Sequence, residues 1–149
     1  GARFTDLAEE LDDPEDVRRL KDYVRLYDRT VADVVPGTWE ILDQLRARGT
    51  PVHAITNWSA ETWPEGLKAQ PRLAEVFGVT VVSGQEGVMK PDPRIYQIFL
   101  QRAGVRAEDC VFIDDGPHNV DGARAVGMDG IHFTGAEALE AALAERGLL

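Results

Sequence analysis

The chain has 149 residues, a formal net charge of −10 and one cysteine. This length suits one domain with a sizeable core. The acidic balance argues against a nucleic-acid partner, which needs a basic surface. No apolar run approaches the length of a membrane span, so we expect no membrane partner. Cys110 alone forms neither an intramolecular disulfide nor a thiolate metal cluster, and we expect a reducing, cytoplasmic setting.

The first stretch of the chain is predicted to be helical. The chain starts without Met and enters at once into helix-like sequence, which indicates a truncated or processed chain. Asp13 and Pro14 are typical of an N-cap and first turn. Apolar side chains recur at helical spacing over residues 17–27. The character of the sequence changes near Pro36, which marks the one expected boundary.

After Pro36, predicted strands and helices alternate. The expected strands cover residues 52–55, 79–82, 110–113 and 131–133, and the expected helices cover residues 39–48, 73–77, a stretch that Gly104 ends, 119–126 and 136–146. This alternation predicts an α/β fold with a doubly wound parallel sheet and helices on both faces.

Polar residues fall at or near the ends of three predicted strands. Thr56 and Asn57 end one strand, Lys90 lies in the loop after another, and Asp114 and Asp115 end a third. In a doubly wound sheet, ligands bind beyond the carboxyl ends of the strands. A hydroxyl, an amide and a lysine can hold phosphoryl oxygens, and two carboxylates can hold Mg²⁺. Together these residues describe a phosphoryl-transfer site.

Each residue by itself also has a simpler interpretation. Thr56 and Asn57 fit a plain turn, and Lys90 fits a solvated loop lysine. The Asp pair fits a helix cap or a turn at Asp115-Gly116. Asn119 fits the N-cap of the next helix. The order of the clusters in one chain favours the functional interpretation.

The other polar and aromatic residues near these strands are less informative. His118 fits a solvent-facing loop residue as well as a substrate contact. His53 lies inside an apolar strand and is predicted to be structural. Trp58 and Trp63 are predicted to pack, although a loop Trp can also line a pocket.

Three segments together resemble a known family. They are "VHAITNWSAETWP", "VVSGQEGVMKPDPRIY" and "VFIDDGPHNVDGARAVGM". They are similar to motifs two, three and four of the haloacid dehalogenase-like (HAD) hydrolase superfamily. Within it, they are most similar to phosphatase-like members with a small helical cap and to the phosphatase domain of soluble epoxide hydrolases. The resemblance runs from Val35 to the C-terminus and implies a Rossmann-like core.

The resemblance also implies roles for single residues. Thr56 and Asn57 would contact the transferring phosphoryl group, and Lys90 would bridge that group and the nucleophile. Thr56 and Lys90 are therefore the expected catalytic residues. Asp115 would ligate Mg²⁺ directly, with Asp114 assisting, often through water.

Asn119 would support the same loop as the Asp pair. Residues 1–34 resemble the C-terminal part of the helical cap that such enzymes insert after motif one. Residues 35–149 resemble the α/β core without its first strand.

Motif one of the family is not found in this sequence. In the family it is a strand ending in D-x-D, whose first Asp is the nucleophile and whose second is the acid/base. "FTDLAEELDDPED" contains acids but follows no apolar strand and is predicted to be helix. The family places the motif-one strand between the strands that end here at Thr56 and Asp114. The nucleophile would therefore lie upstream, and the chain by itself is expected to be inactive.

The leading hypothesis is a Mg²⁺-dependent phosphatase that acts on a small phosphorylated molecule through an aspartyl phosphate. A 2-haloacid dehalogenase uses the same nucleophile without metal, but its relatives tend to carry Ser and Asn at the positions of Asp114 and Asp115. A receiver-type signalling domain also uses paired acids, a Thr and a Lys, but its acid pair comes before the other two. In this chain Thr56 and Lys90 precede Asp114, so the order does not fit. A non-catalytic binding module on the same fold stays open, as do the substrate and the oligomeric state.

Overall fold

A computed structural model describes residues 3–149 of the chain. Its α-helices are α1 (Phe4–Glu9), α2 (Pro14–Arg25), α3 (Thr38–Ala47), α4 (Trp63–Ala69), α5 (Ser83–Glu86), α6 (Pro93–Ala103), α7 (Pro117–Ala125) and α8 (Ala136–Glu145). The strands are β1 (Ala54–Thr56), β2 (Thr80–Val82), β3 (Val111–Asp114) and β4 (Asp129–His132), and the 3-10 turns are η1 (Tyr27–Thr30), η2 (Pro71–Ala74) and η3 (Ala107–Asp109). Within the described part of the chain, no helix is both long and apolar enough to cross a membrane.

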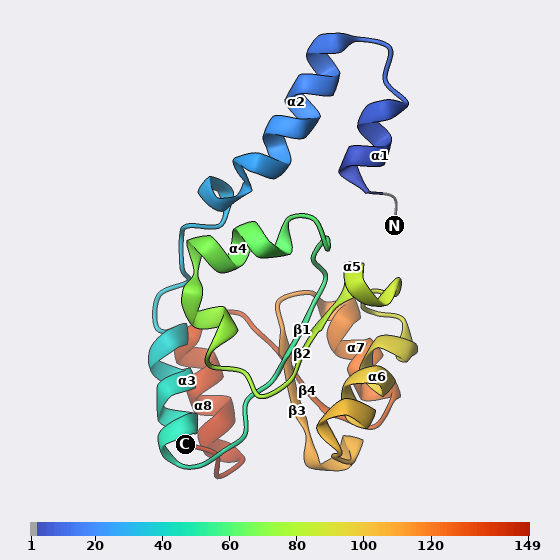
Figure 1. Ribbon diagram of the computed structural model, residues 1–149. Coiled ribbons are helices and arrows are strands. Elements are labelled where there is room, and N and C mark those ends of the chain that lie inside the picture. Colours follow the sequence, from blue (N-terminus) through green and yellow to red (C-terminus); the bar gives the residue numbers. More distant parts are fainter. Residues whose placement is uncertain (1–2) are drawn as a thin grey trace.

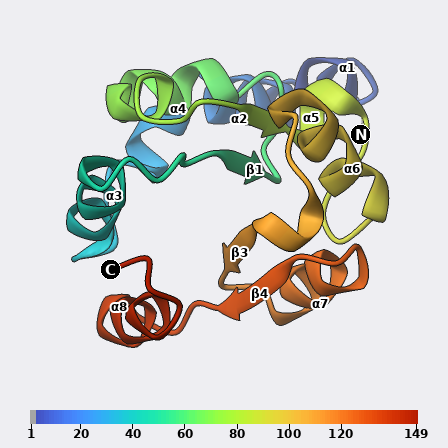
Figure 2. The same ribbon diagram turned by 90° about the horizontal axis from the view of Figure 1, so that it is seen from below.

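The strands form two parallel pairs. β1 pairs with β2, with Ala54 opposite Thr80, and β3 pairs with β4, with Val111 opposite Asp129. No strand pairing joins β1 to β3 among residues 3–149. Figure 2 shows the two pairs facing each other, with β1 and β3 on the inner sides. The predicted α/β fold with parallel strands is confirmed, and its sheet is divided between β1 and β3.

Side chains join the two pairs where the backbone does not. One core lies among β2, β3, α6 and α7, and it consists of Val81, Ile95, Tyr96, Phe99, Phe112, Ala123 and Met128. A second core lies among α3, β4 and α8, and it consists of Ile41, Leu45, Ile131, Leu139 and Leu143. Figure 2 shows α3 and α8 on one side of the strands and α6 and α7 on the other. The helices therefore cover both faces, as the alternating pattern predicts.

The segment between β1 and β2 differs from the prediction. The expected helix over residues 73–77 is wrong, because its first half lies in η2 and the α-helix there is α4. Gly66 lies inside α4 and weakens the helix signal of the sequence. A Cβ at Gly66 would lie 2.5 Å from Cζ2 of Trp58. The glycine is therefore needed for close packing against the indole.

The start of α7 corrects one interpretation of Asn119. The helix begins at Pro117, and Gly116 is its N-cap. Proline suits the first helical turn because its missing N–H has no helical partner there. Asn119 therefore lies inside the helix and is not its N-cap.

The first two helices project from the α/β part of the molecule (Figure 1). The predicted N-cap of α2 is confirmed, because Asp13 Oδ1 accepts a hydrogen bond from the amide of Glu15 at 2.7 Å. Edge-to-face aromatic contacts run from Tyr23 to Tyr27 and on to Trp58, each with ring centroids 5.6 Å apart. Trp58 lies two residues after the end of β1, so these rings connect the helical segment to the end of that strand.

Candidate active site

Lys90 lies between the ends of β1 and β3. Its Nζ donates hydrogen bonds to Asp114 Oδ2 at 2.6 Å and to the carbonyl oxygen of Ile55 at 2.8 Å. The residue is only 9% exposed. The interpretation of Lys90 as a solvated loop lysine is therefore wrong. A carboxylate and a backbone carbonyl thus both accept hydrogen bonds from this buried side chain, as a buried polar group requires.

Asn57 holds the backbone of Lys90 in place. The Asn57 amide nitrogen donates to the Lys90 carbonyl at 3.0 Å, and its oxygen accepts from the Lys90 amide at 2.8 Å. This two-way contact ties the end of β1 to the loop before α6. Thr56 is half-buried at the last position of β1. Asn57 thus does more than form a plain turn, and one of its amide hydrogens remains for another acceptor.

Asp114 accepts hydrogen bonds on both of its carboxylate oxygens. Oδ1 accepts from the amide of Gly116 and from the side chain of Asn119, both at 2.8 Å, and Oδ2 accepts from Lys90. Burial by itself raises the pKa of Asp114, but hydrogen bonds from Lys90, Asn119 and Gly116 outweigh it and hold the pKa below its usual value. Asp114 is therefore a fixed carboxylate within the protein rather than one that points into water.

Asp115 lies one residue further along and is exposed. Its backbone carbonyl lies 3.0 Å from Nε2 of His132 on β4, which fixes the loop and leaves the carboxylate toward solvent. The side-chain oxygen of Asn119 is buried and has no hydrogen-bond partner in the described part of the chain. The end of β3 thus carries two carboxylates and an unpaired amide oxygen.

This set of donors fits Mg²⁺ better than a metal that needs a protein cage. Within residues 3–149 there is no group of three or more His, Cys, Asp or Glu side chains that could hold a metal. Mg²⁺ prefers oxygen ligands, keeps several waters and commonly takes only one or two carboxylates beside a phosphate. Asp115 has the more accessible carboxylate, whereas the oxygens of Asp114 are already engaged.

Tyr96 supports the first turn of α7 from inside the core. Its hydroxyl donates to the backbone carbonyl of Asn119 at 2.7 Å, and the side chain is fully buried. Burial and the charge of Asp114 raise the pKa of Tyr96 to about 12, so the hydroxyl keeps its proton. Ser83 has a similar role after β2, because its hydroxyl accepts from the amide of Trp58 at 3.0 Å. The strand-end rule could have identified Ser83, whereas Tyr96 follows the apolar pattern of α6.

The histidines and tryptophans fall outside this centre. His53 Nδ1 accepts from the amide of Val79 at 3.0 Å, which confirms its structural role. His118 is exposed in the first turn of α7. Trp58 and Trp63 pack edge to face with centroids 5.1 Å apart, as the packing interpretation predicts. Trp58 additionally lines a pocket.

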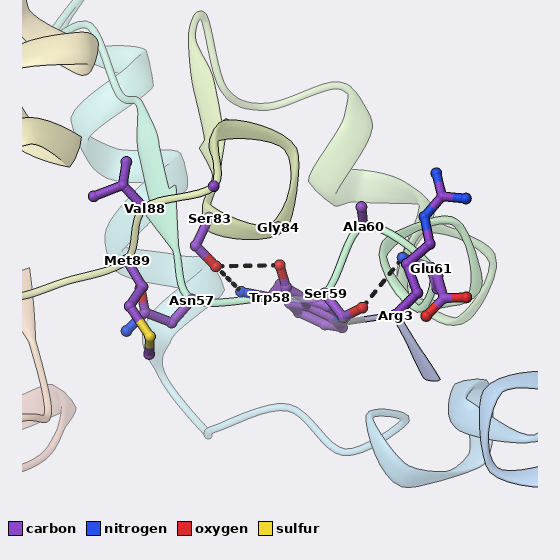
Figure 3. A pocket seen from close by; sticks show the side chains of 11 residues that line it. Arg3, Asn57, Trp58, Ser59, Ala60, Glu61, Ser83, Gly84, Val88 and Met89 are labelled. Carbon is purple, nitrogen blue, oxygen red and sulfur yellow. Dashed lines mark hydrogen bonds between the residues drawn. The ribbon is translucent and has the colours of Figure 1, made fainter. Parts of the chain in front are cut away.

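That pocket lies beside Asn57 and has a volume of about 390 Å³. It is lined by Arg3, Asn57, Trp58, Ser59, Ala60, Glu61, Ser83, Gly84, Gly87, Val88 and Met89. Figure 3 shows Asn57 and Met89 toward one end of the pocket and Arg3 and Glu61 toward the other. The pocket therefore extends from a candidate site residue to the start of α1.

The chain is similar to several known hydrolases. The chain is 35% identical over 112 residues to flavin mononucleotide hydrolase 1 of Arabidopsis thaliana, which covers 75% of this chain and 45% of that protein. It is 31% identical over 116 residues to the phosphoserine phosphatase of Thermus thermophilus, which covers 77% of this chain and 46% of that protein. A crystal structure of a dehalogenase superposes with a TM-score of 0.66 at 28% identity, over 80% of this chain and 52% of the other.

The chain thus spans about half the length of the curated relatives it matches. The family model described as haloacid dehalogenase-like hydrolase matches residues 2–127. That match includes β1, β3, the side chain of Lys90 between them and the loop after β3. With these elements in place, the chain belongs to the haloacid dehalogenase-like hydrolase family.

Proposed function

We propose that this chain forms the phosphate- and Mg²⁺-binding part of a phosphatase that hydrolyses a small phosphorylated molecule through an aspartyl phosphate. The observation that carries the proposal is the buried Nζ of Lys90, held between Ile55 and Asp114 at the ends of two strands. A fixed cation at this position can neutralise charge that develops on a phosphoryl group. The relatives named for flavin mononucleotide and phosphoserine hydrolysis support a phosphate monoester as substrate.

Each site residue has a role in this proposal. The Thr56 hydroxyl and the free amide hydrogen of Asn57 bind phosphoryl oxygens. Asp115 is the direct metal ligand, and Asp114, whose oxygens are engaged, assists. Mg²⁺, when bound, would supply positive charge that stabilises the phosphoryl oxygens. Asn119 supports the loop through its hydrogen bond to Asp114.

The nucleophilic Asp is proposed to lie on a strand between β1 and β3 that residues 3–149 do not supply. The amide of Ala54 donates to Val79, toward β2, so the neighbouring Ile55 directs its backbone groups to the opposite side. On that side the carbonyl of Ile55 accepts a hydrogen bond from Lys90, and no strand of residues 3–149 pairs with that edge of β1. In this proposal residues 1–34 are the C-terminal part of a helical cap, and residues 35–149 are the core without its first strand.

A dehalogenase is the second candidate function. Its specific support is the 28% identical dehalogenase structure. That reaction uses no metal, so the pair of carboxylates at Asp114 and Asp115 favours the phosphatase. A binding module without catalysis is a third possibility, and the same experiment separates the three.

The test compares the 149-residue chain with a longer protein that carries an additional D-x-D strand. Both are assayed with p-nitrophenyl phosphate and Mg²⁺, and with chloropropionate in the absence of metal. We expect phosphate release from the longer protein only, abolished by Asp115→Asn and by chelation. Asp121→Asn is the matched control, because Asp121 is an exposed aspartate on α7.

Three results would contradict the proposal. Metal-dependent turnover that survives Asp115→Asn would remove the role of that carboxylate. Chloride release without phosphatase activity would favour the dehalogenase. No measurable turnover of either substrate by the longer protein would favour the binding module.

A further inference from the structure

The pocket beside Asn57 contains one cationic side chain, that of Arg3. Arg3 is exposed, and no ion pair with a carboxylate is formed by it within residues 3–149. Among the described residues that line the pocket, Glu61 is the only acidic one. Whether Arg3 is free to bind a ligand therefore depends on what Glu61 does.

Glu61 is engaged by the start of α1. Its carboxylate accepts hydrogen bonds from the amide of Phe4, from the amide of Thr5 at 3.3 Å and from the Thr5 hydroxyl at 2.5 Å. Burial raises the pKa of Glu61, but the hydrogen bonds from Thr5 and Phe4 and the charge of Arg3 outweigh it and lower the pKa. Glu61 therefore remains a carboxylate whose oxygens are directed to the backbone of the helix.

This contact replaces the usual N-cap of α1. Arg3 occupies the N-cap position, and its side chain makes no capping hydrogen bond. Arginine is not a favoured N-cap residue, and a cation is unfavourable at the positive end of a helix dipole. Glu61 thus accepts the hydrogen bonds of the first amides of α1 and holds the backbone of Arg3 at the pocket. The guanidinium of Arg3 has no acceptor within residues 3–149.

Asn57 lies toward the other end of the same pocket (Figure 3). If the proposed function holds, the phosphoryl group of the substrate lies at Asn57, and the rest of the substrate extends along the pocket. A volume of about 390 Å³ leaves room for a small organic group between the two ends. A guanidinium binds a carboxylate with two parallel hydrogen bonds.

We propose that Arg3 is a specificity residue that binds a carboxylate on the organic part of the substrate. The preferred substrates are then phosphate monoesters that carry a second negative group, rather than neutral or cationic ones. This inference rests on the proposed function, because it takes the position of the phosphoryl group from it.

The experiment measures binding by isothermal titration calorimetry with Mg²⁺ present. The probes are phosphoglycerate, glycerol phosphate and phosphoethanolamine, whose organic parts carry a carboxylate, a neutral hydroxyl group and an ammonium. We expect phosphoglycerate to bind about tenfold more tightly than glycerol phosphate, as one charge-assisted pair allows. Phosphoethanolamine should bind most weakly.

Variants of Arg3 then separate the effect of its positive charge on substrate preference from a general loss of binding. Arg3→Gln should remove the preference and leave glycerol phosphate binding unchanged, and Arg3→Lys should restore part of the preference. Arg18→Gln is the matched control, because Arg18 is exposed on α2 and does not line the pocket. Arg18→Gln should change neither affinity.

The outcomes distinguish this inference from the proposed function. Equal affinity for phosphoglycerate and glycerol phosphate, or a preference that persists in Arg3→Gln, would overturn the role of Arg3 while the phosphate site stands. Failure of all three esters to bind would overturn both. Binding that Lys90→Met abolishes, with a preference that Arg3→Gln removes, supports both.

Discussion

Nζ of Lys90 lies 2.6 Å from Oδ2 of Asp114, and the two side chains are only 10% and 8% exposed. The lysine comes from the loop after β2 and the aspartate from β3, so this ion pair connects the two halves of a divided sheet. No backbone hydrogen bonds of a strand pairing join the β1–β2 pair to the β3–β4 pair within residues 3–149, so packed side chains and this ion pair hold the two together. The pair is therefore important to stability as well as to the proposed chemistry.

The first prediction concerns the stability of that pair. Lys90→Met should lower the free energy of unfolding by about 3 kcal/mol, because it leaves the buried carboxylate of Asp114 without its counter-charge. Adding Asp114→Asn should recover part of the loss, since the charge is then removed. Urea unfolding of the two single variants and the double variant measures the coupling. Additive losses would contradict the prediction.

The second prediction concerns Tyr96. Tyr96→Phe should cost about 1 kcal/mol, because it removes the hydrogen bond from the buried hydroxyl to the carbonyl of Asn119. We also expect weaker Mg²⁺ binding by calorimetry, since Asn119 lies in the first turn of α7 and its side chain donates to Asp114. Tyr23→Phe is the control, because Tyr23 is 44% exposed on α2. Unchanged metal affinity in Tyr96→Phe would assign the tyrosine to the core alone.

The third prediction concerns Gly84 at the start of α5. A Cβ there would lie 2.3 Å from the amide nitrogen of Ala60 and 2.8 Å from the carbonyl of Trp58, and both are backbone atoms that cannot turn away. Gly84→Ala should therefore lower the melting temperature by several degrees, for a loss of about 2 kcal/mol. Gly78→Ala is the control, because its nearest neighbour is the side chain of His53 at 3.1 Å. Equal shifts for the two variants would argue against a backbone clash.

The fourth prediction concerns pH. Arg146 on the C-terminal side of α8 donates to Asp129 of β4 at 2.5 and 3.0 Å, and this contact lowers the pKa of Asp129. A carboxyl with a lowered folded pKa stabilises the fold above its unfolded pKa of about 3.9, and the contribution disappears as pH falls through the folded pKa.

Because the pair is partly exposed, Asp129→Asn should cost under about 1 kcal/mol at neutral pH. The difference between the native protein and this variant should shrink as the pH falls below the unfolded pKa of about 3.9 and vanish once the pH is below the lowered folded pKa. Thermal unfolding across that range measures it. A difference that grows as the pH falls would reverse the sign and refute the role of the ion pair.

Much of the fold could be predicted because β1, β2 and β3 are short, mainly apolar runs that end at or just before a polar residue, whereas β4 begins with Asp129 and Gly130 and starts earlier than predicted. β3 extends one residue further than predicted and includes Asp114, which is a shift within the normal uncertainty of element ends. The sequence did not identify α4, since Gly66 masks its helical character. It also did not identify Tyr96, because a bond to a carbonyl 23 residues away leaves no periodic signal.

The sequence by itself determined which chemical groups end the strands: Thr56, Asp114 and, in the loop after β2, Lys90. It determined this because a parallel strand covered on both faces must be apolar until it leaves the core. Only the tertiary structure decided that Lys90 is buried and reaches both β1 and β3. That contact joins residues 24 and 35 positions apart, and it depends on which strand edges are left unpaired. No local pattern encodes an unpaired edge, because pairing is a property of the neighbours that a strand meets in space.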